Sequence, residues 1–179
     1  MTHRIRRGAA VAAVSILSLA VAVPAHADSR TFSDPNGDAG IHDDITSVKV
    51  ANGSGGGARV AVRADVGPVH PGDFFTFWFD TRFNDPGPEY KVVVNPGSDG
   101  LELRRLEEFG EAGTVVPCGK LRASADVFSS DDISVSVPRS CLNNPGSIRV
   151  SLRARYLDDG HQVSDWAPEE RKFFSSVAL

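Results

Sequence analysis

The chain has 179 residues, with 19 basic and 23 acidic side chains and a formal net charge of −4. A chain of this length can bury the core of one domain. The acidic balance argues against nucleic acid or an anionic membrane as the main partner, and we expect a monomer.

The N-terminal segment has the pattern of a secretory signal peptide. Three arginines and no acidic residue precede an apolar run at 8–23, and an A-x-A sequence ends at Ala27. The run is about 16 residues long, shorter than the ~20 that a membrane-spanning helix needs. We therefore predict a cleaved signal peptide at 1–27 and a secreted domain at 28–179 without a membrane span. Loss of three arginines changes the formal charge from −4 to −7.

Alternating apolar and polar residues predict antiparallel strands in the mature chain, most clearly at 59–66, 133–137 and 148–156. Further strands are predicted at 44–52, 73–81, 89–95, 100–106, 114–127 and 171–178, between turns rich in Gly, Asn and Pro. No segment of a dozen residues has helical periodicity, although 104–112 fits a short helical turn. About nine strands predict a single all-β antiparallel sandwich, immunoglobulin-like or jelly-roll-like, with little helix.

Cys118 and Cys141 are the only cysteines, and in an exported protein we expect them to form a disulfide bond. They flank a predicted hairpin with its turn at 128–132. If its apolar residues share one face, two residues that face each other in this hairpin have residue numbers that add up to an even number. The numbers of Cys118 and Cys141 add up to an odd number, so the two cysteines cannot face each other in that register. A one-residue bulge is therefore predicted between turn and bridge, at Gly119 or Pro138.

No motif for a serine hydrolase, a zinc protease, a P-loop or a dinucleotide site is present. The mature chain has three histidines in polar or turn contexts, His42, His70 and His161. Its adjacent carboxylates would point to opposite faces of a strand and so form no glycosidase pair. We predict that the protein is not an enzyme. A hydrolase whose site no motif reveals is the weaker alternative.

An acidic segment at 34–44 predicts a calcium site, because oxygen side chains alternate there in a loop that contains glycine. The spacing is similar to the first half of an EF-hand loop but lacks its final glutamate and flanking helices. A series of Asx turns is the alternative interpretation. The predicted ligands, the last from a neighbouring strand end, are Asp34, Asn36, Asp38, Asp43, Asp44 and Asp80.

Three short motifs carry a likeness to a known family: D-P-N-G-D-A-G at 34–40, D-I-T-S-V at 44–48 and an aromatic strand that ends F-D-T at 79–81. Over most of 32–95 the chain resembles DOMON-type domains, which include family 9 carbohydrate-binding modules and glucodextranase-like domains. A later block, V-P-R-S-C-L at 137–142, resembles one in secreted actinobacterial proteins. The resemblance implies a β-sandwich, often with calcium, that binds sugar or haem. Haem-binding members use Met and His ligands, and since the mature chain has no Met we expect no haem.

The two tryptophans are the candidate ligand-binding residues, because sugar-binding members present aromatic side chains. Trp78 lies in a segment that is aromatic on both faces, which favours a core position over a sugar platform. Trp166 lies in a segment predicted to be a polar loop, where exposure is favoured.

We predict a secreted, non-catalytic module that binds polysaccharide or a cell-surface glycan and is stabilised by calcium. The alternative is a cell-surface structural or protein-interaction domain without a small-molecule site. An aromatic groove would favour the first function, and two filled sheet faces with an apolar surface patch would favour the second. A pocket with clustered histidine and carboxylate would favour a hydrolase.

Overall fold

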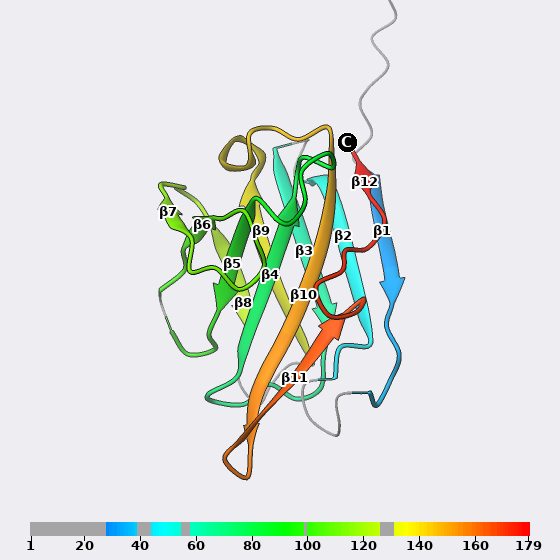
Figure 1. Ribbon diagram of the computed structural model, residues 1–179, viewed down its shortest axis with the longest axis vertical. Helices are drawn as coiled ribbons and strands as arrows, with labels where there is room; N and C mark the ends of the chain where they lie inside the picture. Colours follow the sequence, from blue (N-terminus) through cyan, green and yellow to red (C-terminus); the bar gives the residue numbers. More distant parts are fainter. Residues whose placement is uncertain (1–27, 39–43, 55–57, 99, 126–130) are drawn as a thin grey trace, which may run out of the picture.

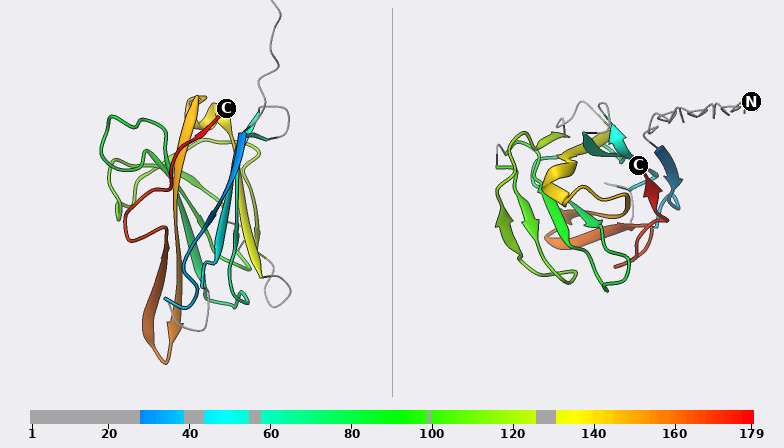
Figure 2. Two further views of the ribbon diagram at one scale, coloured as in Figure 1. Left: turned by 90° about the vertical axis from the view of Figure 1, so that its right-hand side faces the viewer. Right: turned by 90° about the horizontal axis from the view of Figure 1, so that it is seen from above.

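The computed structural model describes residues 28–38, 44–54, 58–98, 100–125 and 131–179. These residues form two antiparallel sheets that face each other (Figures 1 and 2), which confirms the predicted all-β sandwich. The predicted signal peptide and Asp43 lie outside the described residues. Among the residues described, no helix is long and apolar enough to cross a membrane.

The first sheet has five strands, in the spatial order β1 (Asp28–Ser33), β2 (Ser47–Ser54), β3 (Arg59–Asp65), β9 (Asp132–Pro138) and β8 (Arg122–Ala125). The path of the second sheet is β11 (His161–Ala167), β10 (Ser147–Asp158), β4 (Phe74–Asp80), β5 (Tyr90–Val94), β6 (Leu103–Arg105) and β7 (Thr114–Val116). The short strand β12 (Val177–Ala178) pairs with the start of β10, and a 3-10 helix, η1 (Arg139–Leu142), follows β9.

Strand β4 is buried on both faces, as its aromatic sequence predicts. Phe75, Phe77 and Phe79 point into the space between the sheets and are fully buried there. They pack against aliphatic residues that alternate along β2, β3, β9 and β10, so the inter-sheet core follows the period of two that the sequence displays.

The observed strand boundaries differ from the predicted ones where a strand is mainly polar or where a turn interrupts a predicted strand. The described strands number twelve instead of about nine, because β1 and β11 were not predicted and one predicted strand is two strands. Both are edge strands with few apolar residues, so their alternation is weak. The segment at 104–112 forms no helix. The predicted strand at 171–178 is reduced to β12, while Phe173 and Phe174 lie in the connection from β11.

The predicted strand at 114–127 is two strands in different sheets. Pro117 ends β7, and a turn at Gly119–Lys120, where Lys120 has φ 65°, leads the chain across to β8. This crossing places Cys118 outside either ladder.

The predicted disulfide is present, but the predicted bulge is wrong. Cys118 and Cys141 are bonded, with their Cα atoms 5.8 Å apart. The β8–β9 ladder runs from Arg122 to Ala125 without a register shift. The odd sum arises because Cys118 precedes β8 and Cys141 lies in η1, beyond the end of β9. The bond therefore ties the crossing between the sheets to the end of β9.

The disulfide should contribute substantially to stability. The variant with Cys118→Ala and Cys141→Ala is expected to lose about 3.5 kcal/mol of unfolding free energy, because the bond restricts the unfolded chain over a separation of 23 residues. Urea unfolding measures this loss. The exposed Ser140→Ala is the control, with a change within about 0.5 kcal/mol. Quantitative thiol labelling of the native protein without reductant would contradict the bond.

Candidate functional site

Edge strand β11 places consecutive side chains on the two faces of the seven-stranded sheet. Asp165 is paired with Ala154, a core residue of β10, and so faces inward. Trp166 is paired with Arg153, and both face outward. The prediction that Trp166 lies in a polar loop is wrong. The Asp-Gly turn at 159–160, with positive φ at both residues, is a hairpin signal that marks this strand.

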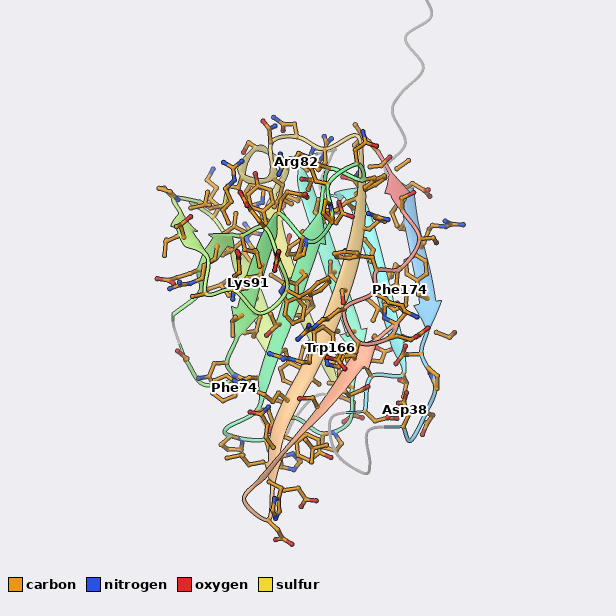
Figure 3. The ribbon with its side chains drawn as sticks, in the orientation of Figure 1. Asp38, Phe74, Arg82, Lys91, Trp166 and Phe174 are labelled. Carbon is orange, nitrogen blue, oxygen red and sulfur yellow. A yellow bond between two sulfur atoms is a disulfide. The ribbon has the colours of Figure 1, made fainter. Side chains whose placement is uncertain are left out.

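Four aromatic rings gather on the outer face, one of them Trp166, whose position Figure 3 labels. The Trp78 and Trp166 rings stack with centroids 4.9 Å apart and an angle of 11° between their planes. Phe109 comes from the loop between β6 and β7. Its ring centroid lies 5.3 Å from that of Trp78 and 5.1 Å from that of Phe173. Trp78 is only 2% exposed, whereas Trp166 is half-buried. Trp78 is therefore buried as expected, but under the rings of the outer face and not between the sheets.

A pocket of about 340 Å³ opens beside these rings. Arg153 lies over both indoles, with its Cζ 5.4 Å from the Trp78 centroid and 5.1 Å from the Trp166 centroid. The Arg153 Nε and the Trp78 Nε1 are buried and have no hydrogen-bond partner among the described residues. A buried donor without an acceptor is costly, and both donors belong to residues that line this pocket, which suits a ligand that accepts hydrogen bonds. Ser164, Glu170 and Arg171 complete the polar lining.

Positive charge surrounds the pocket although the whole chain is acidic. Burial lowers the pKa of Lys91 on β5, and repulsion from Arg104 and Arg153 lowers it further. Burial also lowers the pKa of Arg153, with further repulsion from Arg155 and Arg171, while Glu170 opposes the shift. Arg104, Lys91 and the pair Arg153 and Arg155 lie on β6, β5 and β10, and Arg171 follows β11. Arg104 and Arg171 form ion pairs with Glu102 and Glu170, so the excess positive charge of this face comes from Lys91, Arg153 and Arg155.

An acidic cluster lies on the inward side of β11. Asp34, Asp38 and Asp165 each offer a carboxylate oxygen within 4.8 Å of the others. The Asp165 Oδ2 accepts a hydrogen bond from the Ile45 backbone N–H at 2.6 Å, and the Asp44 Oδ2 accepts one from the Gly37 N–H at 2.9 Å. These bonds hold the chain that follows β1 and the chain that precedes β2 against β11.

The pKa values of two of these aspartates are raised. Burial, followed by repulsion from Asp165, Asp38 and Asp44, raises the pKa of Asp34 to about 7. Burial also raises the pKa of Asp165 to about 6, with added repulsion from Asp38 and Asp44 and partial relief from the Ile45 N–H. Among the described residues, no Lys or Arg forms an ion pair with any of the four aspartates.

The structure groups some of the predicted metal ligands and separates others. Asp34 and Asp38 lie in the cluster and Asp44 lies beside it, whereas Asn36 is exposed. Asp165 was missed, because it is more than a hundred residues from Asp34 in the chain and no local motif marks it.

Asp80 is not part of the cluster. Asp165 pairs across β10 with the Phe75 end of β4, and Asp80 lies five residues further along, about 17 Å at 3.4 Å per residue. Figure 3 shows Arg82, just beyond Asp80, at the opposite end of the molecule from Asp38. The Asp80 carboxylate is fully buried and accepts a hydrogen bond from the Arg149 Nε at 2.6 Å, which makes it a structural ion pair.

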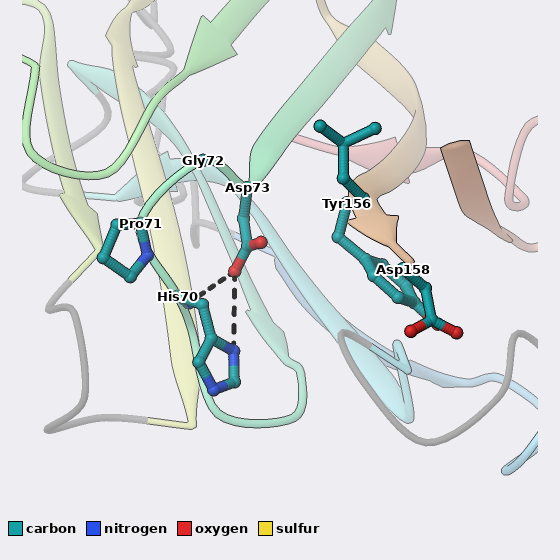
Figure 4. A pocket seen from close by; sticks show the side chains of 7 residues that line it. His70, Pro71, Gly72, Asp73, Tyr156 and Asp158 are labelled. Carbon is teal, nitrogen blue, oxygen red and sulfur yellow. Dashed lines mark hydrogen bonds and ion pairs between the residues drawn. The ribbon is translucent and has the colours of Figure 1, made fainter. Parts of the chain in front are cut away.

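A second pocket, of about 300 Å³, contains a histidine and a carboxylate (Figure 4). The Asp73 carboxylate accepts a hydrogen bond from the His70 backbone N–H and lies 3.9 Å from the His70 Nδ1. Tyr156 and Asp158 form the opposite wall. The described residues that line this pocket include no Ser, Thr, Cys or Lys. The described lining thus combines one histidine–carboxylate pair with a tyrosine and a second carboxylate.

Comparison with protein-family models, with curated proteins and with solved structures finds no match for this chain. The resemblance to DOMON-type domains stays a prediction.

Asp80 should stabilise the fold independently of any metal. Asp80→Ala is expected to lower the free energy of unfolding by about 3 kcal/mol, because it leaves the Arg149 guanidinium without its buried partner. Urea unfolding should show the same loss with calcium and with chelator. Asp85→Asn breaks an exposed pair with Arg82 and is the control, with a loss below about 1 kcal/mol. A loss that appears only with calcium would restore Asp80 as a ligand.

The acidic cluster should make stability depend on pH when divalent cations are chelated. Since the pKa values of Asp34 and Asp165 are about 7 and about 6, against an ordinary 3.8, the folded protein binds more protons than the unfolded chain between about pH 4 and 7. These two groups therefore lower the free energy of unfolding as pH rises through that window. Urea unfolding of Asp34→Asn should give a flatter pH profile than wild type.

The control for this pH series is Asp158→Asn, which removes an exposed carboxylate at the end of β10. It should keep the wild-type profile. Equal profiles for wild type and Asp34→Asn would contradict a raised pKa at Asp34.

Proposed function

We propose that this protein is an exported, non-catalytic binding module that holds an acidic polysaccharide on the outer face of β4, β10 and β11. The observation that carries the proposal is a pair of buried donors without a partner among the described residues, the Trp78 Nε1 and the Arg153 Nε, on two residues that line a pocket walled by aromatic rings. Sugars combine the two features that such a pocket complements, namely C–H faces that pack on rings and oxygens that accept hydrogen bonds.

The charge around the pocket supports a polysaccharide that carries carboxylates. Lys91, Arg104, Arg153, Arg155 and Arg171 gather around one sheet face of an otherwise acidic chain. An arginine binds a carboxylate through charge-assisted hydrogen bonds, which are about twice as strong as neutral ones. A uronate unit supplies this carboxylate, and a neutral glucan does not.

The alternative, a protein-interaction domain, has less support. The large exposed apolar side chains among the described residues come from four separate parts of the chain, and no two of them are on the same strand. They are Phe83, Val115, Leu157 and Leu179.

Affinity electrophoresis tests the proposal with two polymers that differ only in charge. Polygalacturonate in the gel should retard the protein relative to a polymer-free gel, and the fully methyl-esterified polymer should not. The runs contain chelator, so that calcium does not crosslink the polymer. Equal retardation by both polymers would contradict the role of the carboxylates, and no retardation by either would leave the interaction domain ahead.

Two variants test whether the polysaccharide binds in the pocket. Arg153→Gln should weaken binding roughly ten- to a hundredfold, the value of a charge-assisted hydrogen bond. Trp166→Ala should weaken it by up to about tenfold through lost ring contact. Arg63→Gln removes the same charge from β3 in the other sheet and should bind as wild type does. Urea unfolding verifies that each variant is folded. Equal weakening by Arg63→Gln and Arg153→Gln would indicate unspecific charge attraction.

A further inference from the structure

We propose that Asp34, Asp38 and Asp165 together bind a calcium ion, which fastens the segment after β1 to strand β11. This inference goes beyond the proposed function and does not rest on it. The three residues come from two distant parts of the chain, and the grouping includes Asp165 and leaves out Asp80, unlike the set that the sequence predicts.

The spacing of the oxygens fits one ion. Two ligands that each lie about 2.4 Å from a calcium ion are at most about 4.8 Å apart. One oxygen from each of the three aspartates satisfies this limit with respect to the other two. The three carboxylates thus lie within the range of separations that ligands of a single ion can have.

Asp34 supplies an independent sign of a missing partner. Its side chain is only 8% exposed, and both of its carboxylate oxygens are buried without a hydrogen bond, although one of them faces the other two aspartates. The buried Oδ1 of Asp44, beside the cluster, also has no partner within the part of the chain that the structure describes. A buried carboxylate is normally neutralised, hydrogen-bonded or bound to a metal. Among the described residues nothing else supplies such a partner to Asp34.

The ligand chemistry favours calcium over other cations. The described members of the cluster offer only carboxylate oxygens, which are hard ligands and select calcium or magnesium over zinc or copper. Magnesium keeps several waters and binds through one or two carboxylates, whereas calcium accepts more protein oxygens in flexible geometry. A cluster of three carboxylates around the buried Asp34 therefore suits calcium.

The position of the ion connects it to the outer face of the sheet. Asp165 and Trp166 are consecutive residues on an edge strand that pairs only with β10 among the described strands. An ion that holds Asp165 would also restrain the backbone from which the Trp166 ring projects. The tryptophan is close enough to report on the ion, because energy transfer from an indole excites a neighbouring terbium ion.

Calcium titration tests the inference without any glycan, so its outcome is independent of the proposed function. Isothermal titration calorimetry of the mature protein with calcium chloride should show one ion per chain, and terbium should give emission on tryptophan excitation that calcium displaces. Asp34→Asn and Asp165→Asn should each weaken calcium binding at least tenfold. Both variants should fold, because each relieves repulsion and asparagine at 165 keeps an acceptor for the Ile45 N–H.

The matched control is Asp158→Asn, which removes the same charge at the far end of the β10–β11 hairpin and should bind calcium as wild type does. A melting temperature that rises with calcium in wild type and Asp158→Asn, but not in Asp34→Asn, would agree with the titration. Absence of calcium binding, binding that survives both cluster substitutions, or equal affinity for magnesium would overturn the inference.

Discussion

Strand β4 has no face that can be left in water, and this constraint organises the molecule. Its inward phenylalanines need the five-stranded sheet as a cover, and its outward Trp78 needs a second cover. Trp166 and Phe109 provide that second cover, and Phe173 packs in turn on Phe109, so three separate segments contribute. The second sheet is therefore covered by aromatic side chains on part of its outer face, in addition to the packing on its inner face.

The aromatic rings that cover this face also form a wall of the proposed binding pocket. Rings that pack on one another lose little freedom when a ligand arrives, so the pocket is largely preformed. Stability and the proposed recognition thus depend on overlapping side chains. Trp78 is buried in the fold and is also one of the residues that line the pocket.

Period-two alternation predicts the central strands well, because burial on one face is a local property of the sequence. It fails at β1 and β11, where an edge strand can be polar on both faces and still pair. The disulfide follows from composition, whereas its placement outside the ladders depends on the turn at Lys120. The acidic segment at 34–44 is visible in the sequence. The contribution of Asp165 depends on which strand lies next to that segment in the fold. Asp80 was wrongly included, because the sequence does not show at which end of the sheet a strand terminates and so how far Asp80 lies from the segment.

The connection between β11 and β12 leaves one edge of β10 and returns to the same edge. It carries Glu170, Arg171 and Phe173 over the outer face, while the Phe174 N–H donates to the Val150 carbonyl and its ring stacks on Phe32. Both of its ends are thus anchored to a single long strand. The exposed residues at 169–172 lie between those anchors and take part in no strand pairing. Substitutions there are the ones that could alter the proposed ligand preference with the least effect on the fold.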